Sequence, residues 1–306
     1  MEGEGIRGQM KRVLLIVNPV AGRKQIKPSF FNIVTAMSDA GCQIVVKTTK
    51  GRGDATEFAY NAAKNNESDI IVCAGGDGTF NEMLTGVMRS GNTETELGYI
   101  PAGSTNDFAN SLKIPLKPVA AVKNILKNDP TIIDVGRFND RYFSYIASFG
   151  IFTASSYSAP QSVKNVFGHL TYVFEAIKDL SKVTKYHIKA TVDGNILEDD
   201  YIFGAISNSS TVGGVVKLKD GVVDLSDGEF EVTFVRNPSN ISDFNQIVAA
   251  ITSSKLEDCE MIDFARASKI TVESDIPIPW SLDGEYADGG TFSEIENIHL
   301  ACKLRK

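Results

Sequence analysis

From residue 13 to about residue 127, the chain alternates short apolar runs with segments of helical pattern, and this alternation restricts the possible folds most. Strands buried on both faces of a parallel sheet read as continuous apolar runs, because helices cover both sides of the sheet. We therefore predict an α/β domain with a parallel sheet. The expected strands are 13–17, 43–47, 69–73 and 97–100, and the expected helices are 28–40, 54–65, 80–88 and two short stretches after them. Asp54 and Glu57 have capping-box spacing, with Asp54 as the cap.

Beyond residue 131 the pattern changes to many short strands. These are expected at 132–135, 142–148, 187–192, 201–207, 229–235, 269–273 and 298–302, with helices at 163–181 and 241–253. Asn139-Asp140 and Asp193-Gly194 stand where hairpin turns belong. This half is therefore predicted to be a β-rich sandwich or a strongly curved antiparallel sheet. Because a helix is expected to end at Pro130, we place two domains at 11–131 and 132–306.

Composition excludes several classes of function. The 306 residues include 31 Lys and Arg against 38 Asp and Glu, a net charge of −7, which argues against nucleic-acid binding. No apolar run is long enough to span a bilayer, so no transmembrane segment is expected. The 4 cysteines are scattered, which argues against a disulfide framework or a zinc site and favours the reducing cytoplasm. The histidines, His169, His187 and His299, are too far apart for a metalloprotease motif.

The strongest local signal is the sequence Gly75-Gly76-Asp77-Gly78-Thr79, which lies between an expected strand and an expected helix. Glycines let backbone N–H groups approach an anion closely, and the start of a helix adds positive potential. An aspartate in such a loop would repel a bare phosphate, so its presence indicates an intervening Mg²⁺ ion or a water bound to that ion. The alternative is a tight turn in which Asp77 caps the following helix.

Two further loops follow expected strands in the same way. The segment 18–23 reads NPVAGR, and the segment 101–108 reads PAGSTNDF. Loops at the carboxyl ends of strands in an open α/β sheet gather at one crevice, which is the usual ligand site. Their small and hydroxyl side chains suit the ribose and phosphates of a nucleotide, although each loop alone is equally compatible with ordinary turn chemistry.

Taken in order, four motifs resemble the diacylglycerol kinase catalytic-domain family. They are NPVAG at 18–22, GGDGTFNE at 75–82, PAGSTNDF at 101–108 and DGE at 283–285. The resemblance extends over nearly all of the chain after Lys11 and is to the branch of bacterial soluble lipid kinases. That branch is related to sphingosine kinases and more distantly to NAD kinases. The fold that the resemblance implies is an N-terminal domain like that of NAD kinases and phosphofructokinases, followed by a β-rich domain.

The resemblance also assigns roles to individual residues. Asp77 would organise the catalytic Mg²⁺ and its waters, with Asp107 beside it, and Glu285 would accept the proton of the lipid hydroxyl. Residues matching the ATP-binding set are Asn18, Pro19, Val20, Ala21, Gly22, Thr49, Gly76, Asp77, Gly78, Thr79, Phe80, Asn81, Glu82 and Ser104. Because the phosphate loops lie in the first domain and Glu285 in the second, the reaction is expected in the cleft between them. An ordinary hairpin turn is the alternative for residues 283–285.

A second, structural metal ion is implied in the β-rich domain. Asp227 matches its side-chain ligand, and Asp224 and Glu229 would offer carbonyl oxygens. Many relatives have an Ala-Pro segment before this site, whereas residues 216–223 here read VKLKDGVV. This departure puts the metal in doubt, and Asp227-Gly228 as a plain turn is the alternative.

The sequence therefore predicts an ATP-dependent and Mg²⁺-dependent lipid kinase acting on a diacylglycerol-like hydroxyl. An NAD kinase-like enzyme and a non-catalytic lipid- or nucleotide-binding regulator are the alternatives. The acceptor itself is open between diacylglycerol, a sphingoid base, phosphatidylglycerol and other hydroxylated lipids. The helix 163–181 would either dock at an anionic membrane, making the protein peripheral at the inner membrane face, or pack on its own sheet. The oligomeric state is open, with a homodimer as one alternative.

Overall fold

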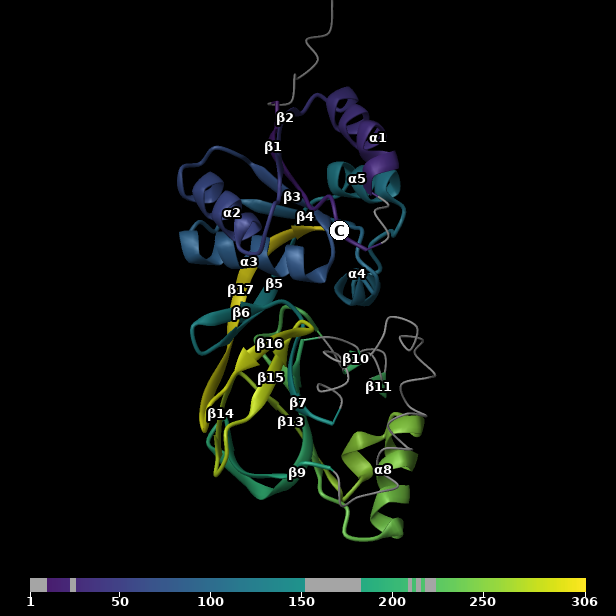
Figure 1. Ribbon diagram of the computed structural model, residues 1–306, viewed down its shortest axis with the longest axis vertical. Helices are drawn as coiled ribbons and strands as arrows, with labels where there is room; N and C mark the ends of the chain where they lie inside the picture. Colours follow the sequence, from purple (N-terminus) through teal and green to yellow (C-terminus); the bar gives the residue numbers. More distant parts are fainter. Residues whose placement is uncertain (1–9, 23–25, 152–182, 209–210, 213–215, 218–223) are drawn as a thin grey trace, which may run out of the picture. The chain divides into compact units, whose positions relative to one another are not determined.

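The computed structural model describes residues 10–22, 26–151, 183–208, 211–212, 216–217 and 224–306 (Figure 1). The chain divides into two compact units. The first consists of Met1–Ile132 with Cys302–Lys306, and the second of Ile133–Ala301. The predicted helix at 163–181 lies outside the described residues.

The first unit is built on a parallel sheet in the order β4-β3-β1-β2. Its strands are β1 (Arg12–Val17), β2 (Gln43–Thr48), β3 (Ile70–Gly75) and β4 (Glu96–Pro101). Its helices are α1 (Ile26–Asp39), α2 (Asp54–Lys64), α3 (Asp77–Ser90), α4 (Asp107–Ser111) and α5 (Pro118–Lys127). Figure 1 shows α1 with α5 on one side of this sheet and α2 with α3 on the other. The predicted α/β domain with a parallel sheet is confirmed.

The outer strand β2 differs from the prediction that helices cover both faces of every strand. Val45 is 52% exposed and Val46 39% exposed, although β1 and β3 beside them are almost wholly buried. The reason is position, because β2 is the last strand of the sheet among the described strands and pairs there with β1. The apolar run at 43–47 therefore predicted the strand correctly, but it did not predict how far its side chains are exposed.

Asp54 does not cap helix α2 as predicted. The N-cap is Gly53, with no side-chain cap hydrogen bond, and Asp54 is the first helical residue. The Asp54 carboxylate instead accepts hydrogen bonds from the backbone N–H groups of Lys50 at 2.6 Å and Gly51 at 2.9 Å. These hydrogen bonds lower the pKa of Asp54 below its ordinary value. They fix the loop that connects β2 to α2.

The second unit is rich in antiparallel strands, as predicted. The sheet order is β16-β15-β7-β9-β8-β14-β17, with β12 pairing to β9 and β13, and β5 pairing to β17 and β6. The strands are β5 (Thr131–Phe138), β6 (Arg141–Phe143), β7 (Ile146–Gly150), β8 (Tyr186–Val192), β9 (Asn195–Ser207), β12 (Phe230–Arg236), β13 (Ile262–Ala267), β14 (Lys269–Ser274), β15 (Pro279–Leu282), β16 (Glu285–Asp288) and β17 (Phe292–Arg305). The remaining elements are the two-stranded pair β10 (Thr211–Val212) and β11 (Val216–Lys217), helix α8 (Ile241–Ser253) and the 3-10 helix η3 (Leu256–Asp258).

Aromatic side chains fill the core of the second unit. Trp280 is fully buried, and its ring centroid lies 5.0 Å from that of Phe138 and 4.9 Å from that of Phe149. Phe230 and Phe234 are also fully buried in the same cluster. Such rings bury large apolar areas, so this cluster holds β7, β12 and β15 together.

The C-terminal residues belong to the first unit, whereas the predicted second domain ran to residue 306. Lys303, Leu304 and Arg305 pair in parallel with β4. Arg305 is 5% exposed, forms an ion pair with Glu96 and donates a hydrogen bond to the Ile125 carbonyl at 3.1 Å. The chain thus returns to the sheet it left near Ile132.

None of the described helices is long and apolar enough to cross a bilayer.

Candidate active site

Three loops of the first unit meet at the carboxyl ends of neighbouring parallel strands. They are residues 18–22 after β1, residues 75–79 at the end of β3, and residues 101–107 after β4. The Asn18 N–H donates to the Ala74 carbonyl at 2.9 Å, and the Ala102 N–H donates to the Gly75 carbonyl at 2.7 Å. The sheet hydrogen bonding therefore continues into the loops and fixes their starting points. The site that these loops form is called the loop site below.

Glycines allow the three loops to approach one another. A Cβ atom on Gly22 would lie 2.4 Å from the Ala102 carbonyl oxygen, and Gly22 also has a left-handed backbone with φ of 49°. A Cβ atom on Gly103 would lie 2.7 Å from the Cα atom of Gly76. Real Cβ atoms do not tolerate such distances, so any other residue at these two positions would push the loops apart.

Helix α3 begins inside the loop site. Its N-cap is Gly76, and the first turn of an α-helix directs backbone N–H groups out of the helix end, where they attract anions. Asn18 links this turn to the first loop, because its side-chain amide donates to the Thr79 hydroxyl oxygen at 3.0 Å. The Asn18 side-chain oxygen in turn accepts from the Val20 N–H at 3.1 Å. The arrangement suits a phosphate group chemically.

Asp77 connects the second loop to the third. Its carboxylate accepts hydrogen bonds from the N–H groups of Asp107 at 3.0 Å and Phe108 at 3.3 Å, which begin the short helix α4. The hydroxyl groups of Tyr99 at 3.2 Å and Thr105 at 3.4 Å also donate to it. Burial and the nearby Asp77 charge raise the pKa of Tyr99, which therefore remains a protonated donor. The N-cap position of α3 itself is Gly76.

The other residues of the predicted ATP set have varied surroundings. The Thr49 N–H donates to the Val17 carbonyl at 2.9 Å, beside the start of the first loop. Glu82 accepts a hydrogen bond from the Gly53 N–H at 3.0 Å through its carboxylate. Phe80 is fully buried between Tyr99 and Phe108, with ring centroids 4.9 Å and 4.8 Å away. Among the predicted site residues of this unit, those that are exposed are Val20, Gly22, Ser104 and Asp107, and those of intermediate exposure are Asn18, Pro19, Thr49, Gly76, Asp77, Gly78, Asn81 and Glu82.

Glu285 lies in the second unit. It is the first residue of β16, is exposed, and follows the turn Asp283-Gly284. Both turn residues have positive φ angles, 49° and 87°, as a tight two-residue hairpin requires. The motif is thus a hairpin turn with an exposed carboxylate directly after it.

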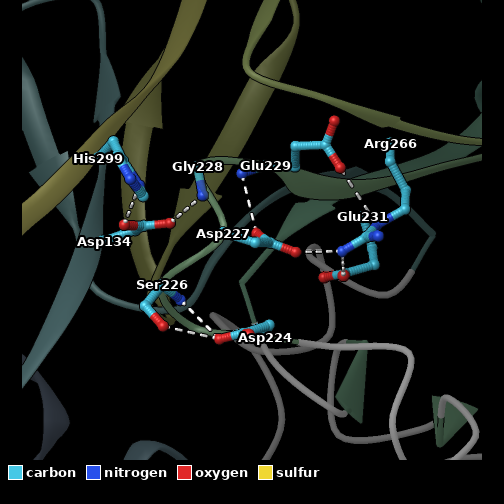
Figure 2. A network of polar contacts seen from close by, with 9 residues as sticks. All are labelled: Asp134, Asp224, Ser226, Asp227, Gly228, Glu229, Glu231, Arg266 and His299. Atoms are coloured by element: carbon cyan, nitrogen blue, oxygen red, sulfur yellow. Dashed lines mark hydrogen bonds and ion pairs between the residues drawn. The ribbon is translucent and has the colours of Figure 1, made fainter.

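The residues predicted for the second metal lie in a network of ion pairs, shown in Figure 2. The Asp227 carboxylate forms an ion pair with Arg266, which also lies 3.6 Å from a Glu229 carboxylate oxygen and 3.9 Å from one of Glu231. Asp224 accepts hydrogen bonds from the Ser226 N–H at 3.1 Å and hydroxyl at 2.8 Å. A guanidinium group therefore already supplies positive charge to these carboxylates.

Asp134 holds the Asp227-Gly228 turn from the other side (Figure 2). This carboxylate is fully buried and accepts hydrogen bonds from the N–H groups of Gly228 and Leu300, each at 2.7 Å, and contacts the His299 ring at 3.0 Å. Within the described part of the chain, no group of three or more His, Cys, Asp or Glu side chains could hold a metal ion. The predicted second site combines one carboxylate, that of Asp227, with the carbonyl oxygens of residues 224 and 229. It stays a prediction, and the proposed reaction does not use it.

The loop site, by contrast, fits a nucleotide and its magnesium ion. The close glycines bring the backbones of the three loops together beside the first turn of α3. The Asp77 carboxylate at this turn is a ligand type that Mg²⁺ prefers, directly or through water. Sequence reasoning missed Tyr99 and Thr105 as partners of Asp77. Tyr99 reads as an ordinary residue of an apolar strand, and its partner lies 22 residues away in the chain.

Comparisons with known proteins agree with the motifs. A family model described as the diacylglycerol kinase catalytic domain matches residues 12–138. A second model, described as the YegS C-terminal NAD kinase beta sandwich-like domain, matches residues 147–295. The two models together account for most of the chain.

Full-length relatives point the same way. A diacylglycerol kinase of Bacillus subtilis (strain 168) is 31% identical over 302 residues, which is 97% of this chain and 98% of that protein. A diacylglycerol kinase of Staphylococcus aureus (strain MRSA252) is 29% identical over 276 residues, covering 90% of this chain and 86% of that protein. A solved structure of a diacylglycerol kinase from Bacillus anthracis str. Sterne superimposes with a TM-score of 0.78 at 24% identity, covering 98% of both chains. A second solved structure, of a protein from the same strain, gives a TM-score of 0.81 at 25% identity, covering 100% of this chain and 98% of that chain.

The fold, with its parallel α/β unit and β-rich unit, and the relatives therefore define a kinase of the lipid kinase class. The chain belongs to the diacylglycerol kinase family, in its bacterial branch.

Proposed function

We propose that this protein transfers the γ-phosphate of ATP to the hydroxyl group of a diacylglycerol-like lipid, with Mg²⁺ as the metal. The observation that carries the proposal is the loop site, where three loops bring Asn18, Gly76, Thr79 and Asp77 together at one edge of the parallel sheet. Phosphoryl transfer needs positioning and charge neutralisation more than covalent help, and these loops offer both.

Within the loop site, the first turn of α3 and the glycine-rich loops would receive the phosphates. The proposed contacts come from backbone N–H groups near Gly76 and from the Thr79 hydroxyl, which Asn18 orients through the 3.0 Å hydrogen bond. Asp77 and Asp107 would hold the magnesium ion or its waters. When bound, that ion neutralises charge on the β- and γ-phosphates. Asp77 also keeps the third loop in place through its bonds to the start of α4.

Glu285 is the proposed general base. The lipid hydroxyl would give its proton to the Glu285 carboxylate while the hydroxyl oxygen forms a bond to the γ-phosphorus. The bond between that phosphorus and the β–γ bridging oxygen breaks, so ADP leaves and a phosphorylated lipid is formed. A lipid hydroxyl is a very weak acid, so the base must come within hydrogen-bond reach of it. Glu285 must therefore come close to the γ-phosphate bound by the first unit, and we propose that the reaction takes place between the two units.

The proposed acceptor lipid implies that the protein works at a membrane surface. A diacylglycerol-like lipid resides in a bilayer, and we propose that the enzyme works from the cytoplasm at the inner membrane face. The 31% identity to a relative named diacylglycerol kinase supports this lipid class. A homodimer stays a prediction, and no step of the proposed reaction depends on it.

The test is ATP consumption with and without lipid, for the natural protein and for Glu285→Gln. We expect lipid-dependent ATP consumption that falls by about 100-fold or more in Glu285→Gln, because a positioned general base contributes roughly this much. ATP binding, measured by calorimetry, should change little because Glu285 acts in the chemical step. Glu273→Gln is the matched control, since Glu273 is an exposed glutamate on β14 of the same unit.

Two results would contradict the proposal. ATP consumption that does not respond to any lipid would remove the lipid kinase assignment. Turnover in Glu285→Gln close to that of the Glu273→Gln control would remove Glu285 as the base while leaving the family membership intact.

A further inference from the structure

The hairpin that carries Glu285 lies at the end of the sheet of the second unit. Strand β16 begins the sheet order β16-β15-β7, so among the described strands it pairs with β15 alone. An end strand of four residues has few backbone hydrogen bonds to hold it, and a hairpin of this kind is mobile unless other contacts restrain it. A base that must reach a hydroxyl within hydrogen-bond distance needs such a restraint.

Asp283 supplies a restraint of this kind two residues before Glu285. Its carboxylate is 4% exposed and accepts hydrogen bonds from three consecutive backbone N–H groups. The donors are Ser144 at 2.6 Å, Tyr145 at 3.0 Å and Ile146 at 3.1 Å. The Ser144 hydroxyl adds a fourth bond at 2.7 Å. A buried carboxylate is expensive unless it is hydrogen-bonded, and these four donors compensate its burial.

A second contact holds the residue on the other side of Glu285. The Arg141 guanidinium donates a hydrogen bond to the Tyr286 carbonyl at 2.9 Å. Arg141 belongs to β6, and Ser144 to Ile146 follow directly after that strand. The backbone around Glu285 is therefore fixed at two points by one segment, residues 141–146.

We propose that Asp283 is a positioning residue of the kinase reaction. By fixing the turn 283–284 to the backbone of residues 144–146, its carboxylate sets the direction in which β16 leaves the turn and hence the place of the Glu285 carboxylate. Asp283 takes no proton and touches neither substrate in this proposal. The inference rests on the proposed role of Glu285 as the base.

The chain contains a matched turn away from Glu285. Asp193-Gly194 joins β8 to β9, and its φ angles of 43° and 87° match those of Asp283-Gly284. The Asp193 carboxylate accepts hydrogen bonds from the N–H groups of Ser268 at 2.9 Å and Lys269 at 2.8 Å and from the Ser268 hydroxyl at 3.2 Å. Hydrogen bonds of the same kind thus hold a turn that carries no predicted catalytic residue. A substitution of Asp193 therefore measures the effect of loosening such a turn on the fold alone, without an effect on Glu285.

The experiment compares Asp283→Asn, Asp193→Asn and Glu285→Gln with the natural protein. Asparagine tolerates the left-handed backbone of both turns, but its amide group faces N–H donors where a carboxylate oxygen accepted their bonds. We expect kcat of Asp283→Asn to fall by about tenfold or more with KM for ATP within about twofold, because misplacement of the base affects the chemical step alone. For Asp193→Asn, kcat should stay within about twofold of the natural value. Thermal unfolding confirms that each variant is folded at the assay temperature.

The outcomes are distinct. If Glu285→Gln is inactive and folded Asp283→Asn keeps its kcat, the positioning role is overturned and the proposed function stands. Equal losses of kcat in Asp283→Asn and Asp193→Asn would also overturn it, since both would then reflect loosening of the unit. If Glu285→Gln keeps its activity, Glu285 is not the base, and the inference fails together with that assignment, whereas lipid-dependent ATP consumption would still support the kinase reaction.

A milder variant covers the case in which Asp283→Asn does not fold. Ser144→Ala removes the hydroxyl donor and leaves the three backbone donors in place. We expect its kcat to fall by about two- to fivefold, with KM for ATP unchanged, because one of the restraints on the turn is lost. An unchanged kcat in folded Ser144→Ala would overturn the proposal.

Discussion

The carboxylate of Asp77 joins the glycine loop after β3 to the start of α4, through the N–H groups of Asp107 and Phe108. The sequence indicated either a magnesium-organising residue or a cap of the helix that Asp77 begins. In the structure this carboxylate accepts two hydrogen bonds from the start of a different helix, about 30 residues later in the chain. Asp77 therefore shapes the loop site in addition to any role toward a metal ion.

Substituting Asp77 should impair both metal use and turnover. Asp77→Asn keeps one oxygen acceptor but removes the charge that would hold Mg²⁺, so we predict a loss of kcat of about 100-fold or more and a higher magnesium requirement. Tyr99→Phe is the control, because it removes one donor to Asp77 at 3.2 Å and leaves the charge in place. Kinetics at varied Mg²⁺ concentration measure both effects. A kcat for Asp77→Asn no lower than that of Tyr99→Phe would contradict this role.

Individual site residues were predictable where local pattern carries the information. Gly76, Asp77 and Thr79 stand out because a run of glycines between a strand and a helix is typical of anion binding. Tyr99 was not predictable in this way, since its contact with Asp77 depends on two strands lying side by side. The four donors to Asp283 were equally hidden, because they lie 137 to 139 residues earlier in the chain.

Among the elements, the apolar strands of the first unit were the most predictable. The strands β13, β15 and β16 were missed, and their sequences show why: IDFARA, PWSL and EYAD contain charged residues or a proline instead of an apolar run or clean alternation. The strand predicted at 142–148 is two strands, β6 and β7. It breaks at Ser144 and Tyr145, whose N–H groups bind the Asp283 carboxylate instead of a neighbouring strand.

The hairpin of β8 and β9 contains a pH-dependent contact. His187 is hydrogen-bonded to the Asp200 carboxylate, and this bond raises the pKa of His187 above the ordinary 6.5. The contribution of this contact to stability is therefore complete below pH 6.5 and is lost as the pH rises through the higher pKa of the folded protein. We predict that Asp200→Asn returns the His187 pKa toward 6.5, measured by NMR titration of the ring protons.

Asp199→Asn is the control for that titration, because Asp199 contacts Arg236 at 3.4 Å. The pKa of His187 should be the same in Asp199→Asn as in the natural protein. An unchanged His187 pKa in Asp200→Asn would show that Asp200 is not the cause of the shift.

For the whole molecule, two compact units were predictable from the change of pattern near residue 131. The pairing of the last residues with β4 of the first unit was not predictable, because the sequence indicated a strand at 298–302, whereas β17 continues to Arg305. This extension of β17 depends on contacts between residues that are far apart in the sequence. Arg305 donates to the Asn128 carbonyl at 2.5 Å, and the Asn128 side chain donates to the Lys306 carbonyl at 2.7 Å. Only a folded first unit brings these residues together.

The reaction proposed for the whole molecule is transfer of the γ-phosphoryl group of ATP to the hydroxyl group of a lipid. The most direct measurement incubates the protein with γ-labelled ATP, Mg²⁺ and vesicles that each contain one acceptor: diacylglycerol, a sphingoid base or phosphatidylglycerol. A further reaction contains NAD in place of lipid. We predict label in the lipid phase for diacylglycerol, migrating as phosphatidic acid. Label transferred to NAD, or recovered solely as inorganic phosphate with every lipid, would contradict this reaction.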